Sequence, residues 1–299
     1  MFKVFAYGGL LVGLALVFAS GCNNNNSGTN APNLPNEPSY YSTELEPSLS
    51  TDREYIYYIT SDTLLADKNG IYRARVTSPA REEILYGFGF HSPVQFPDGS
   101  GVAFLTGGTL NVLDFASGSV STAGVTGNYH AIAFLDDSLL IGCVGKLLYL
   151  INIENPGVSQ LDVNGSDPTY YSADRVITLS ERDNGVWDVC RLRYFDIEEG
   201  PEITVDTLVT ITSEGKVRWL SMEPTLNRYV YVEQRDDANL VFTGQVGTQT
   251  KNFIAQTGHV KPYLLDFNQL IYQGPDGRFY ESDFDGSYHA PFWSTEDDQ

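Results

Sequence analysis

Three of the four histidines stand at similar points of a recurring sequence pattern. His91, His130 and His259 each come just before a short apolar run that we interpret as a strand. Imidazole nitrogens bind metals, and a protonated imidazole binds anions, so histidines gathered at one point could hold either kind of ligand. The alternative is that each histidine is a repeat residue whose hydrogen bond ties a loop to the next strand. The residues favour this alternative, because imidazoles spread around a wide ring need not reach one ion.

Carboxylates recur in several turns between the expected strands. They are candidates for an acidic interaction face that attracts a basic partner or a divalent cation. The residues are Asp62, Asp67, Asp183, Asp236, Asp237 and Asp276. The alternative is turn chemistry, since Asp-Gly and Asn-Gly pairs adopt the backbone angles of tight hairpins. The sequence favours the turn interpretation for most of these positions.

Motifs of nucleophilic or metal-dependent catalysis are missing from the sequence. It has no Gly-x-Ser-x-Gly elbow and no His-Glu-x-x-His pair. No Gly-rich phosphate loop precedes a helix, since little of the chain has a helical pattern. We therefore expect no cofactor, assign no catalytic residue, and favour a non-enzymatic role.

The elements that must position these side chains are short strands. Apolar runs rich in β-branched and aromatic residues, such as 55–59, 102–105 and 229–232, are separated by Gly, Asp, Asn and Pro. Six such units can be aligned on one strand position each. The aligned residues are Tyr72, Val112, Tyr149, Tyr194, Phe242 and Tyr280. Their intervals of roughly 40 residues are the period of a four-stranded propeller blade.

The sequence therefore predicts an all-β propeller of six four-stranded blades over residues 40–299. A sandwich or a barrel would show strands without this longer period. In a propeller the first strands of the blades converge on the mouth of a central channel, where the three histidines are expected. The turns between second and third strands, with their carboxylates, are expected on the same face. Two segments could complete the ring, 39–45 or 287–293, and the sequence does not choose between them.

One blade carries a recognisable repeat. HSPVQFPDG (91–99), VAFL (102–105) and LNVLDF (110–115) together resemble the WD40-like repeat of the TolB carboxyl-terminal propeller. Segments 47–52 and 260–266 match this repeat in part. Related repeats occur in the non-catalytic propellers of prolyl oligopeptidase-type peptidases. The resemblance implies propeller architecture for the whole body and is specific over about one blade.

The amino-terminal segment is typical of an exported chain. Lys3 precedes the apolar run 4–19, which is too short to be a typical membrane span, and Ser20-Gly21-Cys22 resembles a lipobox. That resemblance implies a signal peptide over 1–21 and lipid on Cys22. Residues 22–39, rich in Asn, Ser, Gly and Pro, have the composition of a flexible tether. By resemblance to Gram-negative sorting rules, Asn23 in place of Asp indicates the outer membrane, facing the periplasm.

Composition limits the partners. The formal net charge is −20, which argues against nucleic acid and against anionic lipid headgroups, so lipid is the only membrane contact expected. Cys143 and Cys190 form the remaining pair, which export would allow to oxidise. Because they fall in different expected blades, two buried free thiols are favoured over a disulfide.

Together these features predict a lipid-anchored propeller of the bacterial envelope, acting as a non-enzymatic interaction or scaffold module for an envelope protein. Two alternatives stay open. One is a propeller enzyme, a hydrolase or lyase that uses His, Asp and a divalent metal at the channel mouth. The other is a small-ligand binder with its site at the same mouth.

Overall fold

The computed structural model describes residues 43–61, 69–78, 80–123, 127–183, 185–197, 200–248, 250–257, 261–266 and 268–292. Contacts between residues divide the chain into Met1–Leu34 and Pro35–Gln299, and every described residue belongs to the second unit. The expected signal peptide (1–21) and the expected tether (22–39), with Cys22, lie outside the described residues. Within the described ranges, no helix is both long enough and apolar enough to cross a membrane.

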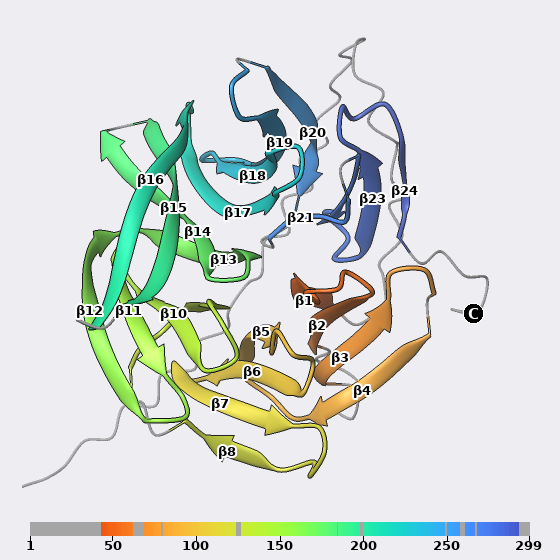
Figure 1. Cartoon of the computed structure of the whole chain (residues 1–299). Coiled ribbons are helices and arrows are strands. Elements are labelled where there is room, and N and C mark those ends of the chain that lie inside the picture. The colour runs from red at the N-terminus through yellow and green to blue at the C-terminus, as the bar shows by residue number, and fades with distance from the viewer. Residues whose placement is uncertain are drawn as a thin grey trace, which may run out of the picture. The chain divides into compact units, whose positions relative to one another are not determined.

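The described residues form six antiparallel sheets of four strands each, arranged around a central axis (Figure 1). This confirms the predicted all-β propeller with six blades. The strands are, in blade 1, β1 (Thr43–Leu49), β2 (Tyr55–Ser61), β3 (Gly70–Arg75) and β4 (Arg81–Tyr86); in blade 2, β5 (Phe90–Gln95), β6 (Gly101–Thr106), β7 (Thr109–Asp114) and β8 (Val120–Thr122); in blade 3, β9 (Ala131–Phe134), β10 (Leu139–Val144), β11 (Leu147–Asn152) and β12 (Gly157–Asn164); in blade 4, β13 (Ser166–Ser172), β14 (Arg175–Asp183), β15 (Val186–Ile197) and β16 (Gly200–Thr212); in blade 5, β17 (Lys216–Glu223), β18 (Arg228–Gln234), β19 (Asn239–Gln245) and β20 (Lys251–Thr257); and in blade 6, β21 (Tyr263–Leu264), β22 (Gln269–Gln273), β23 (Phe279–Asp283) and β24 (His289–Pro291).

The six residues that were aligned from the sequence repeat occupy equivalent positions in the blades. All six aligned residues lie in the third strand of their blade: Tyr72 in β3, Val112 in β7, Tyr149 in β11, Tyr194 in β15, Phe242 in β19 and Tyr280 in β23. An innermost strand precedes the two strands that the sequence shows most clearly. It faces the channel and carries more polar residues, so its apolar signal is weaker.

The core lies between neighbouring blades. The second strands of blades 1 and 2, β2 and β6, are buried almost throughout because both of their faces are covered. The outermost strands β8 and β12 are mostly exposed. Apolar clusters bridge adjacent blades; one joins Tyr58 of blade 1 to Phe279 of blade 6, whose rings meet edge to face at 5.9 Å. Covered second strands explain why the sequence shows continuous apolar runs rather than alternation.

Turn residues account for the hairpins. Gly107 and Gly108 join β6 to β7 with φ values of 57° and 79°, the left-handed angles that a two-residue hairpin of this kind requires. Asp98 accepts a hydrogen bond from the Ser100 amide at 2.8 Å in the turn before β6. This is the Asx-type turn expected from Pro-Asp-Gly.

The ring closes without strand exchange. Blade 1 consists of β1–β4 in chain order and blade 6 of β21–β24, so neither sheet borrows a strand from the other end of the described chain. Of the two segments left open by the sequence, 287–293 therefore supplies the outer strand of blade 6, through β24. Of the other segment, the described residues 43–45 belong instead to β1, the innermost strand of blade 1.

Candidate functional site

One position recurs in all six blades, either within the innermost strand or just before it. These six side chains, which we call the mouth ring, all line a single pocket of about 130 Å³ at one end of the channel. They are Glu46, Ser92, His130, Asp167, Trp219 and Lys261. Two acids, a base, an imidazole, a hydroxyl and an indole thus meet at one mouth. No two blades contribute the same residue type.

The backbone of the mouth ring is strained. Glu46, Ser92, Asp167 and Trp219 have positive φ values of 49°, 48°, 50° and 53°. An irregularity in strand pairing follows directly after each of them. The left-handed conformation costs an L-residue about 1–2 kcal/mol relative to the right-handed one, a cost that glycine would avoid. Side chains kept in such a conformation are a mark of functional sites.

Glu46 links blade 1 to blade 2 across the mouth. Its carboxylate binds Nδ1 of His91 at 3.1 Å and accepts a hydrogen bond from the Ser92 amide. The bond to Glu46 raises the pKa of His91 above its usual range. The Ser92 hydroxyl in turn donates to the carbonyl oxygen of His130 in blade 3, at 3.3 Å. Three adjacent mouth positions are therefore fixed relative to one another.

Lys261 faces blade 4 from blade 6. Its ammonium contacts the hydroxyl of Thr169 and lies 5.2 Å from the centre of the Tyr263 ring. Burial lowers the pKa of Lys261 to about 8, although the carboxylate of Asp167 opposes the shift. Asp167 also accepts a hydrogen bond from the Trp219 amide at 3.4 Å. With a pKa of about 8 the ammonium remains the main form at pH 7, so Lys261 can donate hydrogen bonds and pair with an acid there.

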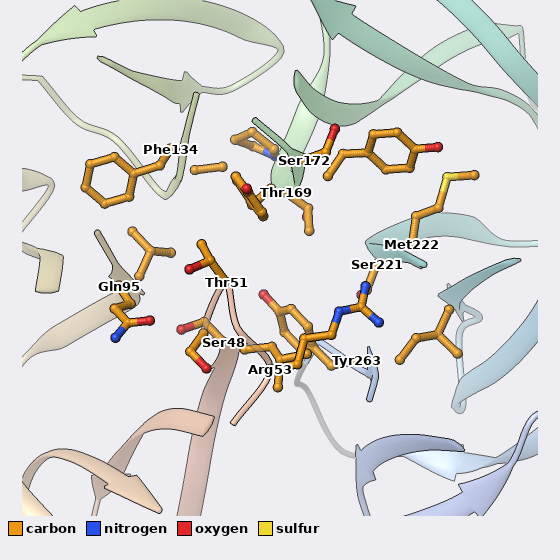
Figure 2. Close-up of a pocket in the computed structure, with 18 of the residues that line it drawn as sticks. Ser48, Thr51, Arg53, Gln95, Phe134, Thr169, Ser172, Ser221, Met222 and Tyr263 are labelled. Atoms are coloured by element: carbon orange, nitrogen blue, oxygen red, sulfur yellow. The ribbon is translucent and has the colours of Figure 1, made fainter. Parts of the chain in front are cut away.

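Below the mouth, the channel widens into a cavity of about 270 Å³ (Figure 2). All six blades contribute to its wall through their innermost strands or the turns that follow them. Polar side chains such as Thr51, Gln95 and Ser221 alternate around it with apolar ones such as Phe134 and Met222. The Ser48 hydroxyl, which is buried, has no hydrogen-bond partner among the described residues. The wall therefore offers both apolar contact and polar anchors.

The predicted histidines do not share one register. His130 belongs to the mouth ring, His91 precedes the ring residue Ser92 by one position, and His259 lies outside the described residues. Partial desolvation lowers the pKa of His130; the charge of Asp167 opposes this shift, and the charges of Arg218 and Lys216 add to it. Among the described residues, no group of three or more His, Cys, Asp or Glu side chains is arranged to hold a metal ion.

The predicted acidic turns are only partly described. Asp62 and Asp67 lie outside the described residues, and Asp183 ends β14 with its side chain undescribed. Asp236 and Asp237 are exposed in the turn between β18 and β19. Asp276 instead serves its own turn, since it accepts hydrogen bonds from the Arg278 amide at 3.1 Å and from the Tyr280 hydroxyl at 2.9 Å.

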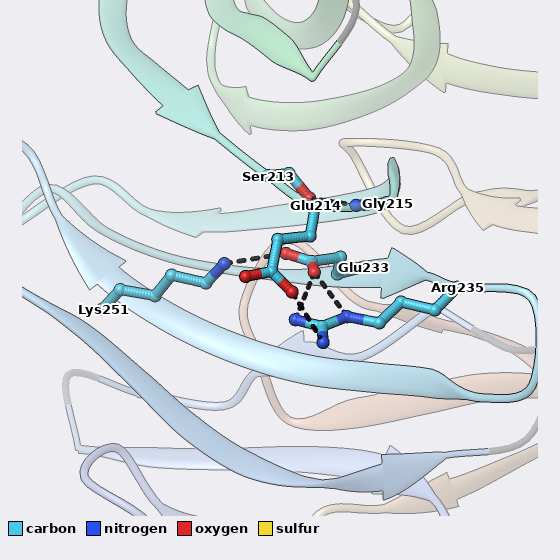
Figure 3. Close-up of polar contacts among 6 residues, drawn as sticks. All are labelled: Ser213, Glu214, Gly215, Glu233, Arg235 and Lys251. Atoms are coloured by element: carbon cyan, nitrogen blue, oxygen red, sulfur yellow. Dashed lines mark hydrogen bonds and ion pairs between the residues drawn. The ribbon is translucent and has the colours of Figure 1, made fainter.

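Cations are interspersed with acids near these turns. Glu233, fully buried beside the β18–β19 turn, binds Arg235 at 2.6 Å and Lys251 at 2.7 Å, while Glu214 binds Arg235 at 2.9 Å (Figure 3). These hydrogen bonds outweigh desolvation and hold the pKa of Glu233 below its usual range. Lys146 binds Glu181 at 2.6 Å on the same face of the propeller. The described part of this face is therefore mixed in charge rather than uniformly acidic.

The sequence analysis missed most of the mouth ring. A signal was present, because four ring residues precede a proline: Glu46, Ser92, Asp167 and Lys261. Proline fits an innermost strand, whose channel side has no hydrogen-bonded neighbour. The recurring residue before proline would have located the mouth more accurately than the histidines did.

The two cysteines are free and buried, as favoured from the sequence. Burial raises the pKa of Cys143 to about 12 and also raises that of Cys190. Neither thiol is suited to nucleophilic chemistry at neutral pH.

No family model and no curated protein matches the chain. Solved structures do resemble it. The propeller domain of the trilobed protease from Pyrococcus furiosus, described as having an open velcro topology, has a TM-score of 0.52 at 11% identity, covering 86% of this chain and 99% of that one. A putative TolB from Agrobacterium tumefaciens has a TM-score of 0.48 at 14% identity, covering 84% and 81%. An acylaminoacyl peptidase from Pyrococcus horikoshii has a TM-score of 0.49 at 13% identity, covering 85% of this chain.

This chain spans 53% of the length of the P. horikoshii peptidase. At these identities the likeness is one of fold alone. The chain is a six-bladed β-propeller, with TolB-like and peptidase propellers among its structural neighbours.

Proposed function

We propose that this chain is a lipid-anchored envelope protein whose propeller binds a protein partner at the mouth ring, without catalysis. The observation that carries the proposal is the contrast between backbone and side chain at one repeat position. Four blades hold the ring residue in a left-handed conformation, yet the residue type differs in every blade. A structural repeat needs the backbone geometry alone. Six different side chains held on it give a surface that can distinguish one partner from another.

Charge and chemistry describe the partner. Two carboxylates, Glu46 and Asp167, flank a single mouth-ring ammonium, and Trp219 supplies the aromatic surface that anchors many interfaces. The rest of the chain is strongly acidic, with a formal net charge of −20. A partner with basic residues around an apolar or aromatic projection fits this mouth. The amino-terminal sequence, with Cys22 after a lipobox-like motif, supports anchorage in the bacterial envelope.

The test is capture of the partner in the native envelope. Cells expressing the full chain are crosslinked, the chain is purified, and co-purifying proteins are identified. The variant Trp219→Gly removes the indole and relieves the backbone strain at φ 53°, so the fold is kept. Asp174→Gly is the matched control, because Asp174 has a φ of 59° and lies in the β13–β14 turn, at the end of the blade away from the mouth.

We expect a reproducible partner with the wild type and with Asp174→Gly, and its loss with Trp219→Gly. A Cys22→Ser chain tests anchorage separately, since loss of capture in that form alone indicates dependence on the lipid. Equal capture by both glycine variants would remove the mouth ring from the interface. If no protein co-purifies with any form, a protein partner is excluded and the channel becomes the candidate site, for a small ligand.

A further inference from the structure

A second pocket lies beside the mouth, between blades 3, 4 and 5. Its volume is about 670 Å³, within the range of small-molecule sites in proteins. Its walls come from the β10–β11 turn, the β12–β13 connection, β14, the start of β15 and the start of β17. It shares only His130 and Asp167 with the mouth ring. We call it the inter-blade pocket.

Basic side chains gather in this pocket. Lys146, Lys216, Arg218 and His130 line it, in a chain that has 18 Lys and Arg against 38 Asp and Glu. Lys146 is paired with Glu181 at 2.6 Å. Beside the desolvation that lowers the pKa of His130, the charge of Asp167 raises this pKa and the charges of Arg218 and Lys216 lower it, so all three charged groups act on His130. Asp167 and Glu181 also line the pocket, so three cations stand there against two carboxylates, in a protein that is strongly negative as a whole.

Two buried donors in the pocket wall lack an acceptor. Trp187 is 4% exposed, and its indole N–H has no hydrogen-bond partner among the described residues. The Nε–H of Arg218 is likewise buried without a partner. A buried donor left unpaired costs about 1–3 kcal/mol, which is why native structures seldom leave one without a reason. Trp187 and Arg218 both line the same pocket.

We propose that the inter-blade pocket binds a small anionic molecule through an oxyanion group, a phosphate or a carboxylate, received by Arg218, Lys216 and the Trp187 indole N–H. An oxyanion presents only acceptors, whereas the guanidinium, the ammonium and the indole N–H are all hydrogen-bond donors. The guanidinium fork also matches the oxygens of a phosphate or a carboxylate. The inference does not depend on the mouth-ring partner, because the ligand reaches a different set of side chains.

The experiment is a ligand titration of the purified mature chain, followed through the indole N–H signals of ¹⁵N-labelled tryptophan. Trp187→Phe assigns the relevant signal. The probes are glucose 6-phosphate and glucuronate, which separate a phosphate from a carboxylate source, and glucose, which has neither. We expect the Trp187 signal to move with at least one anion and not with glucose. No movement with either anion at 10 mM concentrations, on the order of the weakest specific binding, overturns the proposal.

Variants separate this pocket from nonspecific attraction. Arg218→Gln should weaken anion binding about tenfold or more, the effect of truncating one charged hydrogen bond. Arg218→Lys keeps the charge and loses the Nε donor, so an intermediate loss is expected. Arg81→Gln, an exposed residue at the start of β4 in blade 1, makes the same charge change elsewhere and should alter the dissociation constant less than about twofold. Equal weakening by Arg81→Gln and Arg218→Gln would contradict a specific site.

Discussion

Replacing Lys261 by methionine should make the protein more stable at neutral pH. Folding places the Lys261 ammonium against the channel wall and lowers its pKa from the ordinary 10.5 to about 8. A tenfold change in proton affinity is worth about 1.4 kcal/mol, so this shift corresponds to at most about 3.5 kcal/mol of destabilisation by the charged form. The side chain is partly exposed and contacts Thr169, which reduces the net expected gain to about 2 kcal/mol.

The sign of the pH dependence distinguishes this explanation from others. Because the pKa of Lys261 is lower in the folded state than in the unfolded state, the unfolded chain binds more protons between about pH 8 and 10.5. The stability contributed by this group therefore rises with pH across that window and is lowest, and constant, below it. Methionine cannot titrate. The difference between variant and wild type should be largest at pH 7 and should vanish near pH 10.5.

The measurement is urea unfolding of wild type and Lys261→Met at pH 7 and pH 10.5, monitored by circular dichroism. Lys216→Met is the matched control, because Lys216 is exposed at the start of β17 and should change stability by less than about 0.5 kcal/mol. A variant less stable than wild type at pH 7 would refute the reasoning, since it would make the ammonium a stabilising partner of Asp167. A gain that persists unchanged at pH 10.5 would assign the effect to packing.

Three further predictions concern the fold. Glu233→Gln should lower the free energy of unfolding by about 2 kcal/mol at pH 7, because it removes the buried carboxylate that pairs with two partly exposed cations. Because the pKa of Glu233 is depressed in the folded protein, wild-type stability should also fall as the pH drops below about 4.5. Urea titrations should find this fall reduced in the variant. Gly101→Ala places a Cβ 2.2 Å from a backbone carbonyl oxygen and should lower stability by more than about 2 kcal/mol. In Gly118→Ala the new Cβ meets open space, so only the left-handed backbone at φ +64° opposes it, and stability should fall by about 1 kcal/mol. Thermal unfolding of the two variants tests this difference. In a Cys22→Ser chain, a thiol reagent at pH 8 should label Cys143 and Cys190 only after denaturation, and rapid labelling of the native protein would contradict their burial.

The fold was predictable because its signal is repeated and local. Second and third strands are apolar in every blade, so Tyr72, Tyr149 and Tyr280 could be aligned without knowledge of the structure. The way the ring closes was not predictable, since the two candidate segments are similarly short and mixed in character. Their pairing depends on which neighbour they meet in space, and β24 rather than 39–45 completes blade 6.

The candidate site was harder to predict for a physical reason. A functional mouth needs different side chains at equivalent positions, and that difference removes the very repetition by which sequence analysis finds a position. Histidine recurs and so attracted the prediction, yet only His130 among the described histidines is a ring residue. Lys261 and Trp219 recur nowhere else at this position. The carboxylate of Asp276 could be counted from the sequence, but its use by Tyr280 within the turn could not.

Blades 1 and 6 meet without exchanging a strand, and this closure has a mechanical consequence. The chain enters the described structure at β1, which is at once the first strand, a wall of the channel and the carrier of Glu46. No strand from blade 6 is hydrogen-bonded over it. A pull on the chain ahead of Thr43 therefore loads the β1–β2 hydrogen bonds one after another, and it displaces Glu46 before any other mouth residue. Tension on the chain ahead of Thr43 would thus reach the mouth ring through Glu46, and the bonds of Glu46 to His91 and Ser92 would pass it to blade 2.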